Sequence, residues 1–341
     1  MIEDLYLTSN YFASIADVIY SNRKGLEEKI IQENEEMIEM SRNPNFSYIT
    51  TKKIKFKIHN NDVIFSNTEQ LNNLFFHLKR SSNLENITLV THQTDKLIQK
   101  NDFLNKPDCI KKWFSVNVGY EHEDLIPIPV GIASDFSKKN LNVCDFKSFD
   151  KTNYEKKKVS LYLNFQKNTN ESERKNIYNY FSKKEWVIID QPDLDKQTYL
   201  DNLIKSTFVL CPWGNGVDTH RFWETLYSGS IPITKKHITY NYEKQLPILF
   251  VDKYEDITYE LLENFINNFN LDNYDFDVLT KNYWKRQIKL KIDENKDFEI
   301  INEKISTTYY FRIKRIYLKF AKSQFKKVRT ILNKIRSKLG L

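Results

Sequence analysis

The chain has 341 residues and a mass of 40.9 kDa, a length that predicts about two domains. Hydrophobic residues make up 40% of it and aromatic residues 14%, which is enough to build sizeable cores and excludes a fully disordered chain. With only 7 Gly and 8 Pro, collagen-like and Pro/Gly-rich low-complexity classes are excluded as well. The formal net charge of +7 by itself favours an anionic partner such as nucleic acid, a membrane surface or a phosphorylated substrate.

This charge is concentrated at one end. Residues 304–341 contain twelve Lys or Arg and no Asp or Glu. The first 303 residues hold the other 40 basic residues and all 45 acidic ones, so that they carry about −5. The body and the tail therefore need separate explanations.

The cysteines and the N-terminus bear on location. The three cysteines are far apart and form no CxxC pair, which argues against a disulfide framework. Neither a secretory signal nor an apolar stretch long enough to span a membrane is evident. We therefore expect a cytoplasmic protein.

In chain order, the first half reads as helices alternating with short buried strands. Apolar spacing predicts helices over 24–42 and 68–80 and strands over 63–66, 87–91, 113–118 and 126–132. The polar, Lys-rich stretch 145–158 reads as a linker.

After it the alternation restarts, with strands over 159–163, 186–190, 207–210, 231–234 and 248–251 and helices over 171–182, 197–205, 219–228 and 259–269. Such alternation predicts an α/β fold with parallel sheets. We expect two Rossmann-like domains, 1–150 and 151–303, that face each other across a cleft, followed by a helical tail over 304–341.

The most informative window is FVLCPWGNGVDTHRFWETLYSGSIPIT, residues 208–234. It holds three of the seven glycines and two of the five tryptophans. The order is strand, Gly-rich loop, helix, and open α/β sheets bind ligands at such carboxyl ends of strands. Because the helix would point its free N–H groups at the loop, the window predicts an anion site, with Asp218 or Thr219 as the helix cap.

Two charged side chains follow in this helix. Arg221 and Glu224 are three residues apart and share a face. Arg221 could hold a diphosphate with its bidentate fork, and Glu224 could accept the hydroxyls of a ribose. In the alternative reading the two form a surface ion pair and the glycines a tight turn. Taken together the features favour a nucleotide-diphosphate site made of Gly214, Asn215, Gly216, Thr219, Arg221 and Glu224.

The same window resembles the exostosin-like glycosyltransferases of the family 47 type. The family patterns F-x-L-x-P-x-G, S-x-R-x-W-E-A-L and G-x-I-P-V read here FVLCPWG (208–214), THRFWETL (219–226) and GSIPI (229–233). Thr219 and Thr225 depart from the pattern, and the match covers about thirty residues. Weaker echoes are LYLNF (161–165) with ERK (173–175), and PIPVGI (127–132).

This resemblance implies a GT-B fold, a nucleotide-sugar donor in the C-terminal domain, an acceptor on the N-terminal domain and inversion at the anomeric carbon. An inverting transfer needs a general base near the acceptor hydroxyl. On this architecture the base would come from N-terminal loops that follow strands, where His92, Asp95 and Asp135 are the candidates. Asp95 and Asp135 could instead be turn or capping residues.

A competing hypothesis is metal-dependent transfer through an Asp-x-Asp pair. Asp193–Asp195 and Asp275–Asp277 fit that pattern, which arises easily by chance in an Asp-rich chain. Because no His/Cys/Glu cluster has metal-ligand spacing, we expect no metal and no other cofactor.

The basic tail has apolar residues at steps of three and four with Lys and Arg between them, which predicts an amphipathic helix. Such a helix suits an anionic membrane surface, with Arg312, Arg315, Lys319 and Lys326 as headgroup contacts. Packing on the body and binding of nucleic acid are the alternatives, and the acidic body makes nucleic acid the less favoured of them.

The hypothesis that unites these observations is an inverting glycosyltransferase. It would use a nucleotide-diphosphate sugar and a glycan or lipid-linked glycan acceptor in surface polysaccharide synthesis, at the inner membrane face. The alternative is a non-catalytic membrane- or nucleic-acid-binding adaptor on a degenerate transferase fold.

Overall fold

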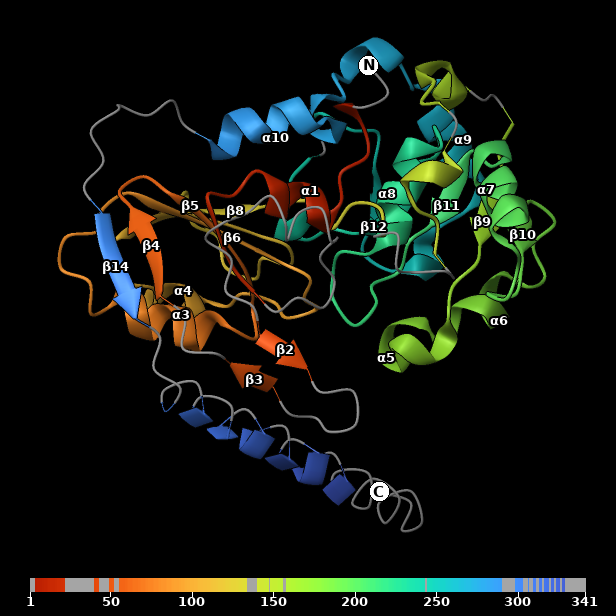
Figure 1. Cartoon of the computed structure of the whole chain (residues 1–341). Helices are drawn as coiled ribbons and strands as arrows, with labels where there is room; N and C mark the ends of the chain where they lie inside the picture. The colour runs from red at the N-terminus through yellow and green to blue at the C-terminus, as the bar shows by residue number, and fades with distance from the viewer. Residues whose placement is uncertain are drawn as a thin grey trace.

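The fold was obtained as a computed structural model, which describes residues 4–21, 40–42, 49–51, 55–133, 140–146, 148–155, 158–242, 244–289, 298–302 and part of 306–328. Its body contains two five-stranded sheets whose neighbouring strands all run parallel. The predicted α/β class with parallel sheets is therefore confirmed (Figure 1).

The first sheet has the order β1-β5-β6-β7-β8. Its strands alternate between two cores: Ile64 and Leu89 enter one apolar cluster, whereas Phe65 and Val90 enter the other, as the period-two geometry of a strand requires. One face packs on the helices α3 and α4. The strands are β1 (Val18–Tyr20), β5 (Val63–Asn67), β6 (Ile87–His92), β7 (Ile110–Ser115) and β8 (Leu125–Pro127), and the helices are α1 (Ser9–Ser14), α3 (Leu71–Leu78) and α4 (Lys100–Leu104).

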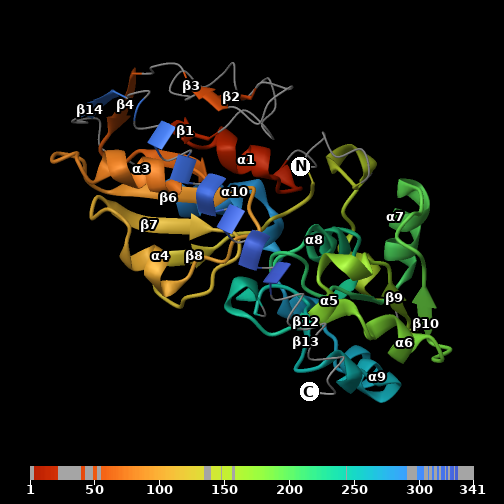
Figure 2. The same ribbon diagram turned by 90° about the horizontal axis from the view of Figure 1, so that it is seen from below.

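The second sheet has the order β10-β9-β11-β12-β13 and is surrounded by α5 to α9 (Figure 2). Its strands are β9 (Leu161–Leu163), β10 (Val187–Ile189), β11 (Phe208–Leu210), β12 (Ile231–Lys235) and β13 (Leu249–Val251). Its helices are α5 (Glu171–Arg174), α6 (Ile177–Phe181), α7 (Lys196–Lys205), α8 (His220–Tyr227) and α9 (Tyr259–Asn267). One continuous apolar cluster runs from this sheet to one face of the first sheet, so the two halves share a core.

Several predicted elements differ from the observed ones; the strand predicted over 113–118, for example, is β7, which runs from Ile110 to Ser115. The helix predicted over 171–182 is two short helices, α5 and α6. The helix predicted over 24–42 is wrong at its end, because 40–42 form strand β2 (Met40–Arg42), which pairs with β3 (Ile49–Thr51), while 22–39 lie outside the described residues. The strand predicted over 126–132 is only β8, which ends at Pro127, and Pro129 soon after has no N–H to give a ladder.

The end of the body returns to the first half. Helix α10 (Lys281–Ile288) lies over α1, where Trp284 contacts Phe12 and Lys289 forms a 3.0 Å ion pair with Asp17 (Figure 1). Strand β14 (Phe298–Asn302) then pairs antiparallel with β4 (Lys55–His59). Helix α10 and strand β14 therefore both contact elements of the first half.

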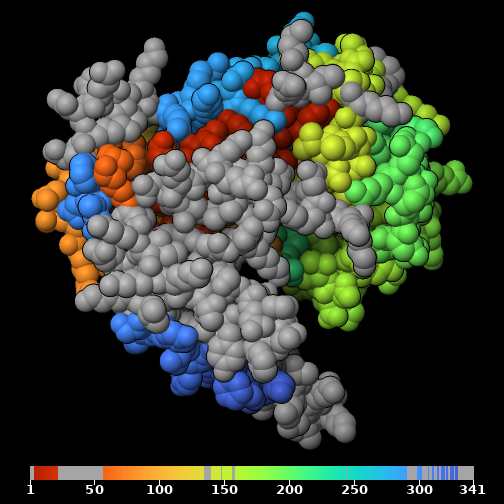
Figure 3. Space-filling view, in the orientation of Figure 1, coloured from red at the N-terminus to blue at the C-terminus, as the bar shows by residue number. Residues whose placement is uncertain are grey.

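The tail lies beneath the body. Its described residues between 306 and 328 are helical and lie at the surface (Figure 3), and the large apolar side chains among them are solvent-exposed. In the described part of the chain, no helix has both the length and the apolar character needed to cross a membrane.

Candidate functional site

The Gly-rich loop follows β11 at the carboxyl edge of the second sheet and leads into α8, as the sequence predicts. Gly229 stands directly after the C-cap Ser228 with φ +68, a left-handed conformation that favours glycine at this place. Thr219 is the N-cap of α8, but its side chain makes no capping hydrogen bond. The Thr219 hydroxyl is therefore not used to hold the helix.

The buried side chain of Arg174 holds the backbone of the loop in place. Arg174 of α5 is 4% exposed, and its guanidinium donates to the carbonyls of Gln166, Pro212 and Trp213 at 2.8–3.0 Å. Burial, and next the neighbouring Arg221, lower the pKa of Arg174 to about 10. It therefore stays charged at neutral pH and fixes the backbone of the loop.

Arg221 is the second guanidinium in this place. Arg174 and Arg221 lie 5.4 and 5.9 Å from the ring of Phe165. Burial opposes the charge of Arg221, but Tyr199, Cys211 and Glu224 outweigh it and its pKa is raised. Two like charges thus converge on one aromatic side chain, an arrangement that an anion would stabilise.

Three buried polar atoms near the loop have no hydrogen-bond partner within the described residues: Trp213 Nε1, Thr219 Oγ1 and Arg221 Nε. Buried donors in native proteins are nearly always paired. All three atoms belong to the loop or the start of α8, where free helix N–H groups and the helix dipole also favour an anion. The unpaired donors therefore indicate a ligand rather than a closed structural network.

Glu224 is 4% exposed and accepts a 2.9 Å hydrogen bond from the Tyr199 hydroxyl. Burial raises its pKa, against the lowering effect of His220 and Arg221. Although both residues are described, Arg221 and Glu224 form no ion pair, so the surface-pair reading of this motif is wrong.

The other residues predicted to bind the nucleotide-sugar donor differ in their exposure. Gly214 and Gly216 are buried and close the loop by a 3.0 Å hydrogen bond between their backbones, whereas Asn215 is exposed. A Cβ on Gly216 would lie 2.8 Å from Asn117 Nδ2 of the first half. A side chain at position 216 would therefore have to displace Asn117 from its hydrogen bonds to Thr94 and Asp218.

The contact between the halves is centred on Asp218, which the sequence marked only as a possible cap. Its carboxylate accepts from the backbone of Val130 at 2.7 Å and from Trp223 Nε1 at 2.8 and 2.9 Å, and its own N–H donates to Asn117. Burial raises the pKa of Asp218 to about 7. In the sequence, the short spacing between Asp218 and Trp223 was the available sign of this contact. The partners Val130 and Asn117 could not be predicted, because only the fold brings them to Asp218.

The candidates for the catalytic base differ in environment. His92 is 1% exposed; Gln93 N–H donates to its Nδ1 at 2.8 Å, and its Nε2 lies 3.0 Å from the Pro129 carbonyl. Burial lowers the pKa of His92 to about 3. Since both ring nitrogens are occupied, these contacts argue against His92 as the base.

Asp95 is exposed in the loop after β6, and Asn117 anchors that loop by donating to the carbonyl of Thr94 at 3.0 Å. Asp95 therefore lies near the contact between the two halves and remains a candidate for the catalytic base. Asp135 lies in 134–139, outside the described residues, as do Arg312, Arg315, Lys319 and Lys326 of the tail.

The Asp-x-Asp pairs have other contacts. Asp195 caps α7 by accepting from the backbone and hydroxyl of Thr198 at 2.9 and 2.7 Å. Asp275 accepts from the backbone of Asp277, which lies 3.7 Å from Arg286. Among the residues that the structure describes, no three His, Cys, Asp or Glu side chains gather as a metal site would need.

Neither a protein-family model nor a curated protein matches this chain.

Proposed function

We propose that the protein is a glycosyltransferase that takes its sugar from a nucleotide-diphosphate donor held at the loop between β11 and α8. The observation that carries this proposal is the pair of converging guanidiniums with unpaired Arg221 Nε and Thr219 Oγ1 beside it. A diphosphate would supply the acceptor oxygens and the negative charge that these groups lack.

The surroundings fit such a donor. Glu224 has one carboxylate oxygen on Tyr199 and can present the other to a ribose hydroxyl. The loop faces the first half, where Asp95 stands near the junction as the base for an inverting transfer and Asp135 is the second candidate. A GT-B arrangement, with the donor on the second half and a glycan or lipid-linked glycan acceptor on the first, accommodates these placements.

The direct test is donor binding. We expect UDP, GDP, dTDP or one of their sugar conjugates to raise the unfolding temperature of the full chain, and Arg221→Ala to abolish the shift. Arg286→Ala is the matched control, because Arg286 is 67% exposed and far along the chain. No shift with any nucleotide would favour the non-catalytic adaptor instead.

For the tail we propose association with an anionic membrane, which would place the enzyme at the inner face. Apolar side chains of the described tail residues are 42% exposed at Tyr309 and up to 76% at Phe325, so they are not packed on the body. Twelve cations without an acidic residue accompany them, and each cation near such a surface contributes about 1 kcal/mol.

Sedimentation with vesicles tests this location. The full chain should bind phosphatidylcholine vesicles that contain phosphatidylglycerol, and deletion of 304–341 should release it while β14 and the body stay folded. Pure phosphatidylcholine is the control. Equal binding by the truncated chain would contradict the proposal, and stronger binding to RNA than to vesicles would favour the nucleic-acid alternative.

A further inference from the structure

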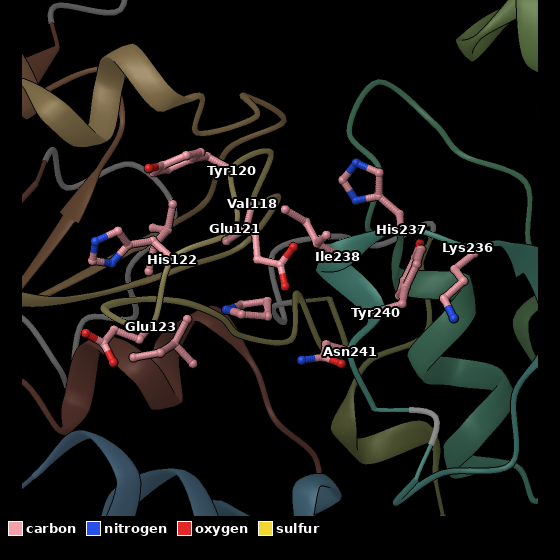
Figure 4. A pocket seen from close by; sticks show the side chains of 13 residues that line it. Val118, Tyr120, Glu121, His122, Glu123, Lys236, His237, Ile238, Tyr240 and Asn241 are labelled. Atoms are coloured by element: carbon pink, nitrogen blue, oxygen red, sulfur yellow. The ribbon is translucent and has the colours of Figure 1, made fainter.

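A cavity lies beside the loop between β11 and α8. It has a volume of about 890 Å³ and is lined by the stretch between β7 and β8 on one side and by the turn after β12 on the other (Figure 4). That volume is in the range of small-molecule sites. None of the residues predicted as donor or base contacts lines it, so the cavity is distinct from both predicted sets of contacts.

The cavity shares a wall with the donor loop. Trp213, whose carbonyl is held by Arg174, packs edge-on against His237 of the lining at 5.3 Å. Tyr240 of the lining donates to the carbonyl of Val217 in the loop at 2.6 Å. An occupant of the cavity would therefore lie next to a donor bound at the loop.

One wall combines a fixed aromatic surface with carboxylates. Tyr120 and His122 pack on Phe103 with ring centroids at 5.7 and 4.5 Å. Glu121 and Glu123 of the same wall are exposed, and Figure 4 shows the Glu121 carboxylate reaching toward Ile238 and Asn241 on the opposite wall. Within the described part of the chain, Glu121 has no hydrogen-bond or ion-pair partner.

This lining selects among ligand chemistries. Ionised carboxylates only accept hydrogen bonds, so they match the hydroxyl donors of a sugar. Aromatic and aliphatic walls match the apolar face of a sugar ring. Lys236 is the one Lys or Arg among the thirteen lining residues, whereas Glu121 and Glu123 lie together on the opposite wall, so a carboxylate or phosphate beside these two would meet like charge.

We propose that this cavity binds an uncharged sugar ring of the acceptor, with Glu121 accepting from its hydroxyls and Tyr120 supporting its apolar face. The proposal rests on the proposed function, because it treats the cavity as the acceptor side of the same reaction. It adds the acceptor class: a neutral glycan end, and not a uronic acid or a phosphorylated sugar.

Saturation-transfer NMR on the full chain tests the site with methyl glycosides of glucose, galactose, mannose and N-acetylglucosamine. Methyl glucuronide serves as the charged match of the glucoside. We expect transfer to at least one neutral glycoside, weaker binding of the glucuronide, and about tenfold weaker binding of the neutral sugar in Glu121→Ala, since one charge-assisted hydrogen bond is lost. Asp108→Ala, which removes another exposed acid of the same half, should leave binding unchanged.

Two further variants test the charge of Glu121 and the ring of Tyr120 separately. Glu121→Gln should improve glucuronide binding, because it removes the repelling charge and keeps an acceptor oxygen. Tyr120→Ala should weaken every glycoside. No transfer to any neutral glycoside, or a preference for the glucuronide in the wild type, would overturn the inference.

The donor proposal has a separate readout. The UDP-induced thermal shift should be lost in Arg221→Ala and kept in Glu121→Ala. A protein that binds UDP but no glycoside would contradict only the acceptor site, and one that binds glycosides but no nucleotide would contradict only the proposed donor.

Discussion

The loops after β6 and β11 occupy equivalent places, each at the carboxyl edge of a parallel sheet, yet they differ in how their polar groups are used. After β6, the ring of His92 is buried with both nitrogens paired. After β11, Arg221 Nε and Thr219 Oγ1 are buried without a partner. A position at a sheet edge is common to both loops, and the buried unpaired donors are what distinguish the loop after β11, at which we propose the donor site.

The most direct test of this difference between the two loops is to remove the side chain of Arg221. We expect Arg221→Ala to lower the rate of transfer by about 10²–10³-fold, the cost of losing one preorganised donor to a developing charge. The measurement is release of nucleotide from the donor found by the thermal-shift screen. Arg221→Lys should recover part of the rate, because it keeps the charge and loses the fork.

Rates of Arg221→Ala close to wild type, with the exposed Arg286→Ala equally active, would show that the unpaired guanidinium does not serve the donor.

The next largest effect concerns the support of the loop. Arg174→Met fills a similar volume but leaves the carbonyls of Gln166, Pro212 and Trp213 without their buried donor. We expect a loss of about 3 kcal/mol in the free energy of unfolding, since a hydrogen bond from a charged group contributes about 1.5–3 kcal/mol and a buried acceptor left unpaired costs about 1–3 kcal/mol. Chemical denaturation followed by tryptophan fluorescence measures it.

Lys167→Met, at a partly exposed cation–π contact with Tyr178, is the control. An equal effect of both changes would mean that Arg174 contributes no more than a surface cation.

The smallest effect is a pH dependence at the junction of the two halves. The pKa of Asp218 is raised from 3.8 to about 7 by burial, so the folded state binds more protons than the unfolded state between these values. The ionised carboxylate therefore lowers the stability of the fold above pH 7, and this loss disappears as the pH falls toward 4. His92, with its pKa lowered to about 3, acts in the opposite direction below pH 6.5.

Comparison of the wild type with Asp218→Asn cancels the contribution of His92. The stability of the wild type relative to Asp218→Asn should rise by about 2–3 kcal/mol from pH 8 to pH 5, given 1.36 kcal/mol for each unit of pKa shift. A constant difference over this range would mean that the N–H groups of Val130 and Trp223 stabilise the carboxylate in the folded state as well as water does in the unfolded state.

Local pattern was sufficient for much of the fold. The alternation of buried strands and amphipathic helices predicted all five strands of the second sheet and four of the first, missing β1. Predictions for β11, α8 and β12 were within one residue at every boundary. Gly229 was predictable at the end of α8 because a left-handed residue there is a local requirement.

What local pattern could not provide were the contacts between distant segments. Arg174 stood in the sequence only as part of an echo of a family motif, and its carbonyl partners 38 and 39 residues away depend on how α5 packs on the loop. Asp218 meets Val130 across 88 residues. Likewise, His92 Nε2 has a partner only because the ends of β6 and β8 bring it close to the carbonyl of Pro129.

The return of β14 to β4 has a consequence for the order in which the molecule is completed. Ile301 of β14 belongs to the same apolar cluster as Ile58 of β4 and the face of the first sheet. The ribosome must therefore synthesise the whole of the second half before the first half receives its last strand. A nascent chain usually completes its domains from the N-terminus onward; here the first half receives strand β14 only after the second half has been made.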